Sequence, residues 1–117
     1  MTIREMYEAT GADYDDVLAR LMGKEELVKR LVLKYDKDPN YDKLKNAISI
    51  NSYQDAFEAA HTIKGLAANL GFARLYTASA ALTEKLRAQA YEDLAPLFED
   101  VCRAQEELLE KIEAVDD

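Results

Sequence analysis

The sequence predicts an all-α protein, organised as an antiparallel up-and-down four-helix bundle with additional short N-terminal helices. Only four glycines and two prolines interrupt the 117 residues, and no segment alternates β-branched and polar residues for long enough to form a strand. Apolar residues instead recur at spacings of three and four, as in amphipathic helices. Short connections between such helices favour antiparallel neighbours, which is the arrangement of this type of bundle.

Two short helices are expected ahead of the bundle. Asp13 can cap the first of them, and Gly23 can stop it. The apolar residues of this helix are Val17, Leu18 and Leu21. The second helix begins after Gly23, and its apolar face consists of Leu27, Val28, Leu31, Val32 and Tyr35.

Turn and cap residues delimit the first two helices of the bundle. The segment Asp38-Pro39-Asn40 ends the preceding helix and starts the first bundle helix, because proline does not fit in a helix interior. Ser52 and Asp55 are spaced as in a capping box for the second bundle helix. Gly71 supplies the C-terminal stop of that helix. The apolar face of the first bundle helix consists of Leu44, Ala47 and Ile48.

The third and fourth bundle helices repeat the same apolar spacing. Pro96 fits only in the first turn of the last helix. Cys102, on the same helix, is expected as a small buried apolar side chain. The two apolar stripes consist of Leu75, Ala78, Leu82 and Leu86 in the third helix and of Leu94, Leu97, Val101, Leu108 and Ile112 in the fourth.

Length and composition indicate one domain over residues 1–117, with the bundle core at about residues 40–114. The chain starts at Met1 and contains no linker, so a stand-alone domain is expected. A monomer is expected as well, because the apolar stripes can be covered within one bundle. The longest apolar runs are only a few residues, which predicts a soluble, cytoplasmic protein with no membrane association.

Charge and cysteine content exclude further classes of protein. The formal net charge of −8 argues against nucleic-acid binding, which depends on basic side chains that neutralise phosphates. One cysteine excludes an internal disulfide. One histidine cannot build a multi-histidine metal site, so no metal site is expected in this chain.

That single histidine, His61, is predicted to face solvent from the second bundle helix. Each helical residue advances by about 100°, which places the apolar stripe of the helix at roughly 140° to 240° from His61. Lys64, Gly65 and Ala68 lie within about 60° of His61 on the same helical wheel. Because the apolar stripe must face the core, the imidazole faces water. The stripe consists of Ala56, Ala59, Ile63, Leu66, Ala67 and Leu70.

Three features surround His61. Gly65 lies one turn later, where glycine costs about 1 kcal/mol relative to alanine, so its lack of a side chain either leaves room for a partner or permits close packing with a neighbouring helix. Lys64, at the i+3 position, either holds a negative charge near the imidazole or is simply solvated. Phe57, Gly65 and Ala68 form a small or apolar surface of the kind that marks docking sites.

Together these features indicate a nucleophilic histidine whose reaction is completed by a partner. An exposed imidazole can attack phosphorus through a ring nitrogen near neutral pH. The sequence contains no phosphate-binding loop and no dinucleotide-type glycine pattern. A small hydrolase with His61 as general base is disfavoured, because a convex bundle surface seldom provides a pocket.

The segment from Ala60 to Gly71 reads AHTIKGLAANLG and resembles the signature of histidine-containing phosphotransfer (HPt) domains, approximately His-x-aliphatic-Lys-Gly-small-x-x-x-aliphatic-Gly. The resemblance implies a phosphorelay carrier without kinase activity of its own. His61 would accept a phosphoryl group from a response-regulator receiver domain or a histidine kinase and pass it to a receiver aspartate. No cofactor is expected on this chain, whereas Mg²⁺ is expected on the receiver partner.

The same resemblance implies roles for residues near His61. Lys64 would lie close to the phosphoryl oxygens, and Gly65 would give the partner room. A polar residue on the following helix can orient the imidazole in such domains, and an ungapped alignment through Gly71 brings Thr83 and Arg87 near that role. Both residues would also stabilise the phosphoryl group, together with Lys64. Thr83 is shorter than the amide that is usual there. Leu66 also departs from the pattern, since a small residue is more common after the glycine, and altered packing is the expected effect.

A second function remains open from the sequence. The chain could be a non-catalytic helical-bundle adaptor that binds a partner protein through the surface of Phe57, Gly65 and Ala68. In that case His61 would be incidental, and His61→Ala would preserve binding and function.

Overall fold

The computed structural model describes residues 1–116, which form helices and no strands, so the all-α prediction is confirmed. None of these helices combines the length and the apolar content needed to cross a lipid bilayer. The elements are α1 (Ile3–Ala9), α2 (Tyr14–Arg20), α3 (Glu25–Tyr35), α4 (Asn40–Ser49), α5 (Tyr53–Leu70), α6 (Ala73–Arg87), the short 3₁₀ helix η1 (Tyr91–Asp93) and α7 (Leu94–Glu113).

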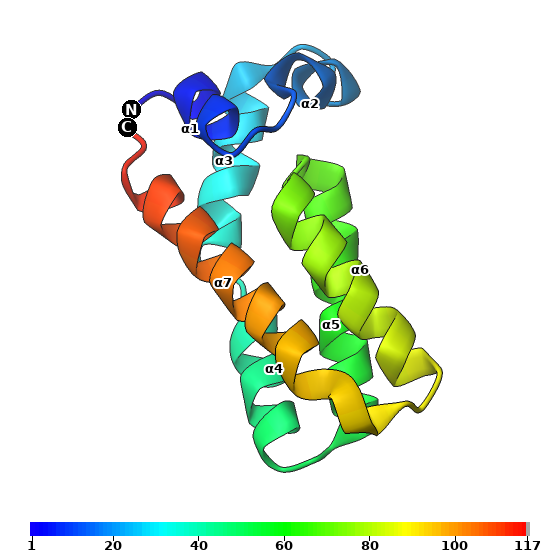
Figure 1. Ribbon diagram of the computed structural model, residues 1–117. Helices are drawn as coiled ribbons and strands as arrows, with labels where there is room; N and C mark the ends of the chain where they lie inside the picture. Colours follow the sequence, from blue (N-terminus) through cyan, green and yellow to red (C-terminus); the bar gives the residue numbers. More distant parts are fainter. Residues whose placement is uncertain (117) are drawn as a thin grey trace.

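Helices α4 to α7 form the predicted bundle, in which successive helices alternate in direction (Figure 1). Helix α3 runs beside the upper part of α7 in Figure 1, and α4 lies below α3 on the same side of α7. The Tyr35 hydroxyl at the end of α3 donates a hydrogen bond to the Gln105 side-chain oxygen on α7, across 2.5 Å. Helices α1 and α2 lie over the end of the bundle at which α5 turns into α6 (Figure 1).

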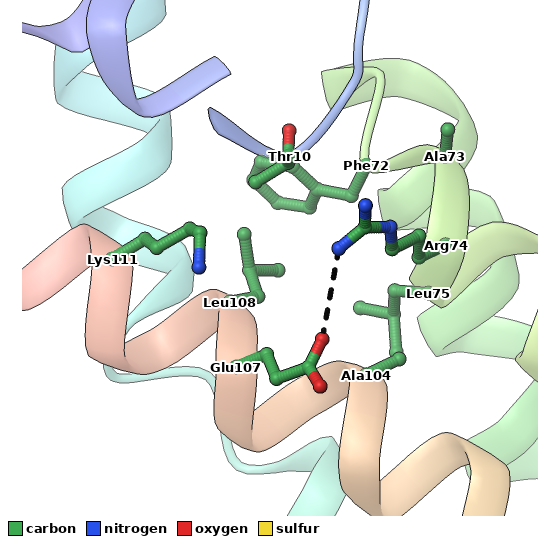
Figure 2. A pocket seen from close by; sticks show the side chains of 9 residues that line it. All are labelled: Thr10, Phe72, Ala73, Arg74, Leu75, Ala104, Glu107, Leu108 and Lys111. Atoms are coloured by element: carbon green, nitrogen blue, oxygen red, sulfur yellow. Dashed lines mark ion pairs between the residues drawn. The ribbon is translucent and has the colours of Figure 1, made fainter. Parts of the chain in front are cut away.

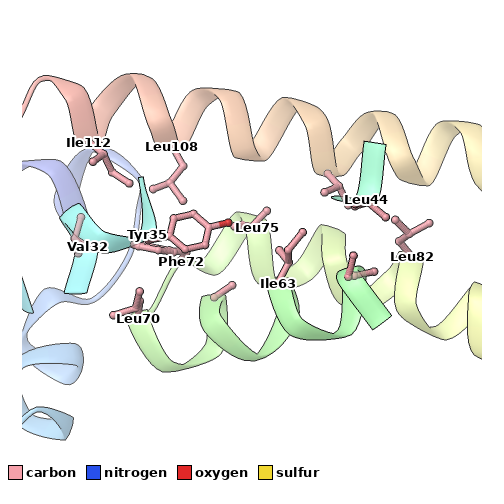
Figure 3. Packing of buried hydrophobic residues seen from close by; sticks show 14 of the residues in the cluster. Val32, Tyr35, Leu44, Ile63, Leu70, Phe72, Leu75, Leu82, Leu108 and Ile112 are labelled. Carbon is pink, nitrogen blue, oxygen red and sulfur yellow. The ribbon is translucent and has the colours of Figure 1, made fainter. Parts of the chain in front are cut away.

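The core lies between α7 on one side and α5 and α6 on the other, as the inward-pointing side chains in Figure 3 show. These side chains are almost completely buried, and apart from Phe72, the N-cap residue of α6, they come from the positions that the helical spacing predicts. The aromatic rings of Tyr35 and Phe72 meet next to Leu108 (Figure 3), with the two ring centroids 5.3 Å apart. The labelled core residues are Val32, Tyr35, Leu44, Ile63, Leu70, Phe72, Leu75, Leu82, Leu108 and Ile112.

Apart from the short 3₁₀ helix η1, the element that the apolar spacing does not predict is helix α1. Its N-terminus carries a reciprocal capping box, in which the Glu5 N–H donates to the Thr2 hydroxyl across 3.1 Å and the Thr2 N–H donates to the Glu5 carboxylate across 2.9 Å. The Thr-x-x-Glu spacing is visible in the sequence. It predicts a helix start even where the helix is only seven residues long.

Of the two side-chain caps predicted at helix starts, one is present in the structure and the other is not. Asp13 caps α2 as expected, since its carboxylate accepts from the Asp16 N–H across 3.2 Å. The prediction of a capping box at the start of α5 is wrong. Ser52 occupies the N-cap position, but its hydroxyl donates to the Asp55 carboxylate across 2.7 Å and makes no bond to the helix backbone. Cys102 is also less buried than expected, because it lies at the half-exposed edge of α7.

Gly71 ends α5 in the left-handed conformation, with a φ of 70°, as predicted. A Cβ atom at this position would also collide with the Val17 side chain of α2. Two N-terminal side chains bind carbonyls of the last turn of α5, which have no partner within the helix. The Tyr7 hydroxyl donates to the Leu70 carbonyl across 2.6 Å, and the Arg20 guanidinium donates to the Ala68 carbonyl across 2.8 Å. The N-terminal helices therefore close the end of the histidine-bearing helix.

Candidate functional site

His61 lies in the middle of α5, and its side chain is exposed to solvent. The opposite face of the helix is buried, with Ile63 and Ala67 fully enclosed in the core. This is the orientation that the helical wheel predicts. Helix α5 packs against α4 and α6 through its buried face, so the imidazole projects from a helix that is held on its opposite side.

An aromatic side chain lies beside the imidazole. The Phe57 ring, one turn earlier on α5, is nearly parallel to the His61 ring, with an interplanar angle of 9° and a centroid separation of 5.8 Å. Arg87 reaches this ring from the end of α6, with its guanidinium carbon 5.1 Å from the Phe57 centroid. The same guanidinium pairs with the Glu84 carboxylate across 3.4 Å. The structure thus brings Phe57, His61 and Arg87 together from two helices.

Lys64 lies half-buried on α5, three residues after His61. Residues at this spacing are neighbours on a helix surface, roughly 5 to 6 Å apart at Cβ. None of the ion pairs formed by residues 1–116 involves Lys64. Its ammonium group is therefore available to a charge that arrives at the imidazole.

Gly65 occupies open space. A Cβ atom built at this position would have no other atom within 4 Å, apart from the local helix backbone. Close packing against a neighbouring helix therefore does not explain this glycine, and the second of the two interpretations drawn from the sequence is wrong. Ala68, one turn later, is exposed as well. One and two turns beyond the imidazole, the exposed side of α5 thus carries a glycine and an alanine.

Thr83 is not brought to His61 by the structure. Its side chain on α6 is fully buried, and its hydroxyl donates to the Ser79 carbonyl of the same helix across 2.6 Å. A buried hydroxyl that is already hydrogen-bonded cannot reach phosphoryl oxygens at the surface. The expected role of Thr83 is corrected accordingly. Leu66 is half-buried and packs against the core, as its position on the wheel predicts.

The sequence does not reveal two contacts of this site. Glu84 pairs with Arg87 at the i+3 spacing that is favourable on helices, but sequence alone does not show which of the many acidic residues lies near the histidine. The parallel arrangement of Phe57 and His61 follows an i, i+4 spacing that the sequence does contain. The sequence interpretation places Phe57 only in the docking surface.

A concave region lies between the start of α6 and α7 (Figure 2). Arg74 and Glu107 pair across it, 3.8 Å apart. Its lining includes none of the predicted site residues. In the part of the chain that the structure describes, no three His, Cys, Asp or Glu side chains are arranged to hold a metal ion.

Comparison with known families agrees with this geometry. The Hpt domain model matches residues 37–117, which comprise α4 to α7 and the exposed histidine. No curated protein and no solved structure matches the sequence. The match extends over more than half of the chain and leaves α1 to α3 outside it. The chain therefore belongs to the Hpt domain family.

Proposed function

We propose that this protein is a histidine phosphotransfer protein of a two-component phosphorelay, which accepts a phosphoryl group on His61 and exchanges it with a receiver-domain aspartate. The observation that carries the proposal is the exposed imidazole beside Gly65, whose missing side chain leaves open space. Membership of the Hpt domain family supports it. Open space beside an exposed nucleophile suits a reaction whose remaining groups come from a partner.

The transfer itself requires little chemistry from this chain. The lone pair of one ring nitrogen of His61 forms the phosphorus–nitrogen bond while the phosphorus–oxygen bond to the receiver aspartate breaks. The bonding electrons stay on the aspartate carboxylate, and the other ring nitrogen keeps its proton. Such a loose, in-line transfer depends on positioning and on neutralising the charge of the phosphoryl oxygens. Bound Mg²⁺ on the receiver would neutralise part of that charge.

Two cations of this chain, Lys64 and Arg87, would neutralise the remaining charge. A phosphoryl group adds nearly two negative charges at neutral pH. Lys64 has no ion-pair partner in residues 1–116 and is adjacent on the helix, so we assign it to the phosphoryl oxygens. Arg87 is already paired with Glu84, and it would contribute after exchanging that carboxylate for the phosphoryl group.

The partner would dock over Phe57, Gly65 and Ala68, which lie on the same side of α5 as His61. A receiver domain or the histidine kinase that supplies the phosphoryl group would cover this surface in turn. We propose a monomer that carries the group between them and has no kinase activity of its own.

The test is to incubate the purified protein with a phosphorylated receiver domain and Mg²⁺ and to measure acid-labile, base-stable phosphate on the wild type and on His61→Ala. We expect labelling of the wild type alone. If both proteins fold alike and neither is labelled by any receiver or kinase, the phosphotransfer proposal fails. Binding of a partner that survives His61→Ala would then identify the adaptor function.

A further inference from the structure

The orientation of the His61 imidazole has no hydrogen-bonding explanation within residues 1–116. None of the side-chain hydrogen bonds in that part of the chain involves either ring nitrogen of His61. The threonine hydroxyl on the following helix is buried and bonded to its own backbone. An exposed imidazole without a contact would rotate freely about its χ2 bond, and its nitrogens would point in varying directions.

The contact that the imidazole does make is with Phe57. The two rings are parallel within 9°, and their centroids are 5.8 Å apart, which lies within the range of favourable offset stacking. Residues four apart on a helix meet in this way because their side chains lie one above the other. A parallel stack restricts the plane of the imidazole. It uses neither ring nitrogen, so both stay free for a reaction.

Phe57 is itself held from the neighbouring helix. The Arg87 guanidinium lies over the phenyl ring, in the geometry of a cation–π contact, and the Glu84 carboxylate pairs with that guanidinium. The phenyl ring is half-buried and packs against the core. Glu84, Arg87, Phe57 and His61 therefore form a continuous series of contacts from α6 to the imidazole.

We propose that Phe57 is a positioning residue for phosphotransfer, which holds the plane of the His61 imidazole by stacking and is held in turn by Arg87. The inference rests on the proposed role of His61 as phosphoryl acceptor. It assigns the orienting function to an aromatic side chain on the same helix. Phe57 thus acts on the reaction rate within the complex, in addition to any contact it makes with the partner.

The first experiment examines the imidazole without any partner, by NMR of the wild type, Phe57→Leu and Phe57→Tyr. Phe98→Leu is the matched control, since Phe98 is another half-buried phenylalanine, on α7. We expect contacts between the protons of the two rings, and one ring orientation of His61, in the wild type, Phe57→Tyr and Phe98→Leu. Phe57→Leu should show an imidazole averaged over several orientations. Equal averaging in the wild type and Phe57→Leu would overturn the proposal.

The second experiment separates positioning from docking. The four proteins are phosphorylated with phosphoramidate, a donor from which ammonia leaves as the phosphohistidine forms, and are then mixed with a receiver domain at a series of concentrations. We expect Phe57→Leu to lower the transfer rate at saturating receiver by about tenfold. Any rise in the receiver concentration that gives half of that rate reports the docking contact of Phe57, which is separate from the rate at saturation. Phe57→Tyr should restore the rate.

An unchanged transfer rate of Phe57→Leu at saturating receiver would overturn the inference. A normal rate at saturation with a raised half-saturating concentration would show that Phe57 serves only for docking. If the wild type takes no phosphoryl group from phosphoramidate and none from a receiver, the proposed function fails. The NMR comparison still decides in that case whether Phe57 orients the imidazole, so the two failures are distinguishable.

Discussion

The Tyr7 hydroxyl donates a buried hydrogen bond to the Leu70 carbonyl across 2.6 Å, although 63 positions separate the two residues. Tyr7 lies outside the segment that matches the Hpt domain model, whereas Leu70 ends the helix that carries His61. Phe72 continues this contact, because its ring stacks on that of Tyr7 with centroids 6.0 Å apart. The N-terminal helices therefore belong to the same packed unit as the site.

Tyr7→Phe should lower the free energy of unfolding by about 1 to 2 kcal/mol, because the Leu70 carbonyl would be left buried and unpaired. Urea unfolding followed by circular dichroism measures this difference. Tyr76→Phe is the matched control, since Tyr76 is 39% exposed, and its effect should stay within about 0.5 kcal/mol. Equal stability of Tyr7→Phe and the wild type would mean that the hydrogen bond contributes nothing to the fold.

Gly65→Ala and Gly71→Ala should have opposite effects on stability. Gly65 lies inside a helix with open space around it, so alanine there should raise the free energy of unfolding by up to about 1 kcal/mol. Gly71 has a positive φ and faces Val17, so alanine there should lower it by about 2 kcal/mol. Thermal or urea unfolding of the two variants checks both signs.

The same Gly65→Ala variant should transfer phosphoryl groups more slowly than the wild type, because a methyl group would crowd the approach to His61. Rapid-quench measurement of transfer to a receiver domain provides the comparison. A variant that is more stable and transfers at the normal rate would show that Gly65 does not serve partner access.

Lys64→Ala should slow transfer by about five- to tenfold, since a charge-assisted contact to the phosphoryl oxygens is lost. The unfolding midpoint should hardly change, because Lys64 has no ion-pair partner within residues 1–116. Lys34→Ala, at an exposed lysine of α3, is the control for loss of a positive charge. The assigned role would be rejected if the two variants transferred at the same rate.

Stability should fall in alkaline solution. Burial raises the pKa of the Tyr7 and Tyr35 hydroxyls above the usual value of about 10. The unfolded chain therefore loses these protons first. Above about pH 10 the folded state holds more protons than the unfolded state, so the free energy of unfolding decreases as the pH rises.

Urea unfolding at several pH values from about 8 to about 11 measures this dependence. Tyr7→Phe should show a smaller decrease than the wild type, since it has lost one of the tyrosine hydroxyls whose pKa is raised by burial. A constant free energy of unfolding over this range would contradict the prediction.

How far the sequence predicts this structure depends on the kind of contact involved. Helical spacing predicts the exposure of His61 and the burial of Ile63, because the geometry of a single helix determines which residues share a face. It does not predict where a residue on another helix will lie. Thr83 illustrates this limit, since packing and a hydrogen bond to its own helix backbone turn its hydroxyl inward.

Short polar side chains set a second limit. Ser52 and Asp55 have the spacing of a capping box, yet their side chains hydrogen-bond to each other. Short polar side chains can hydrogen-bond either to the helix backbone or to one another. Thr2 and Glu5 have the same spacing and do form the box. Sequence spacing alone does not distinguish these two outcomes.

A single open face around one imidazole has a kinetic consequence for the proposed relay. The donor and the acceptor of the phosphoryl group would need the same few side chains of α5, so the two complexes exclude each other. The loaded protein would have to dissociate and diffuse before it could deliver. The flux through such a relay would then depend on how long the free phosphorylated form survives and on the cellular concentrations of its competing partners.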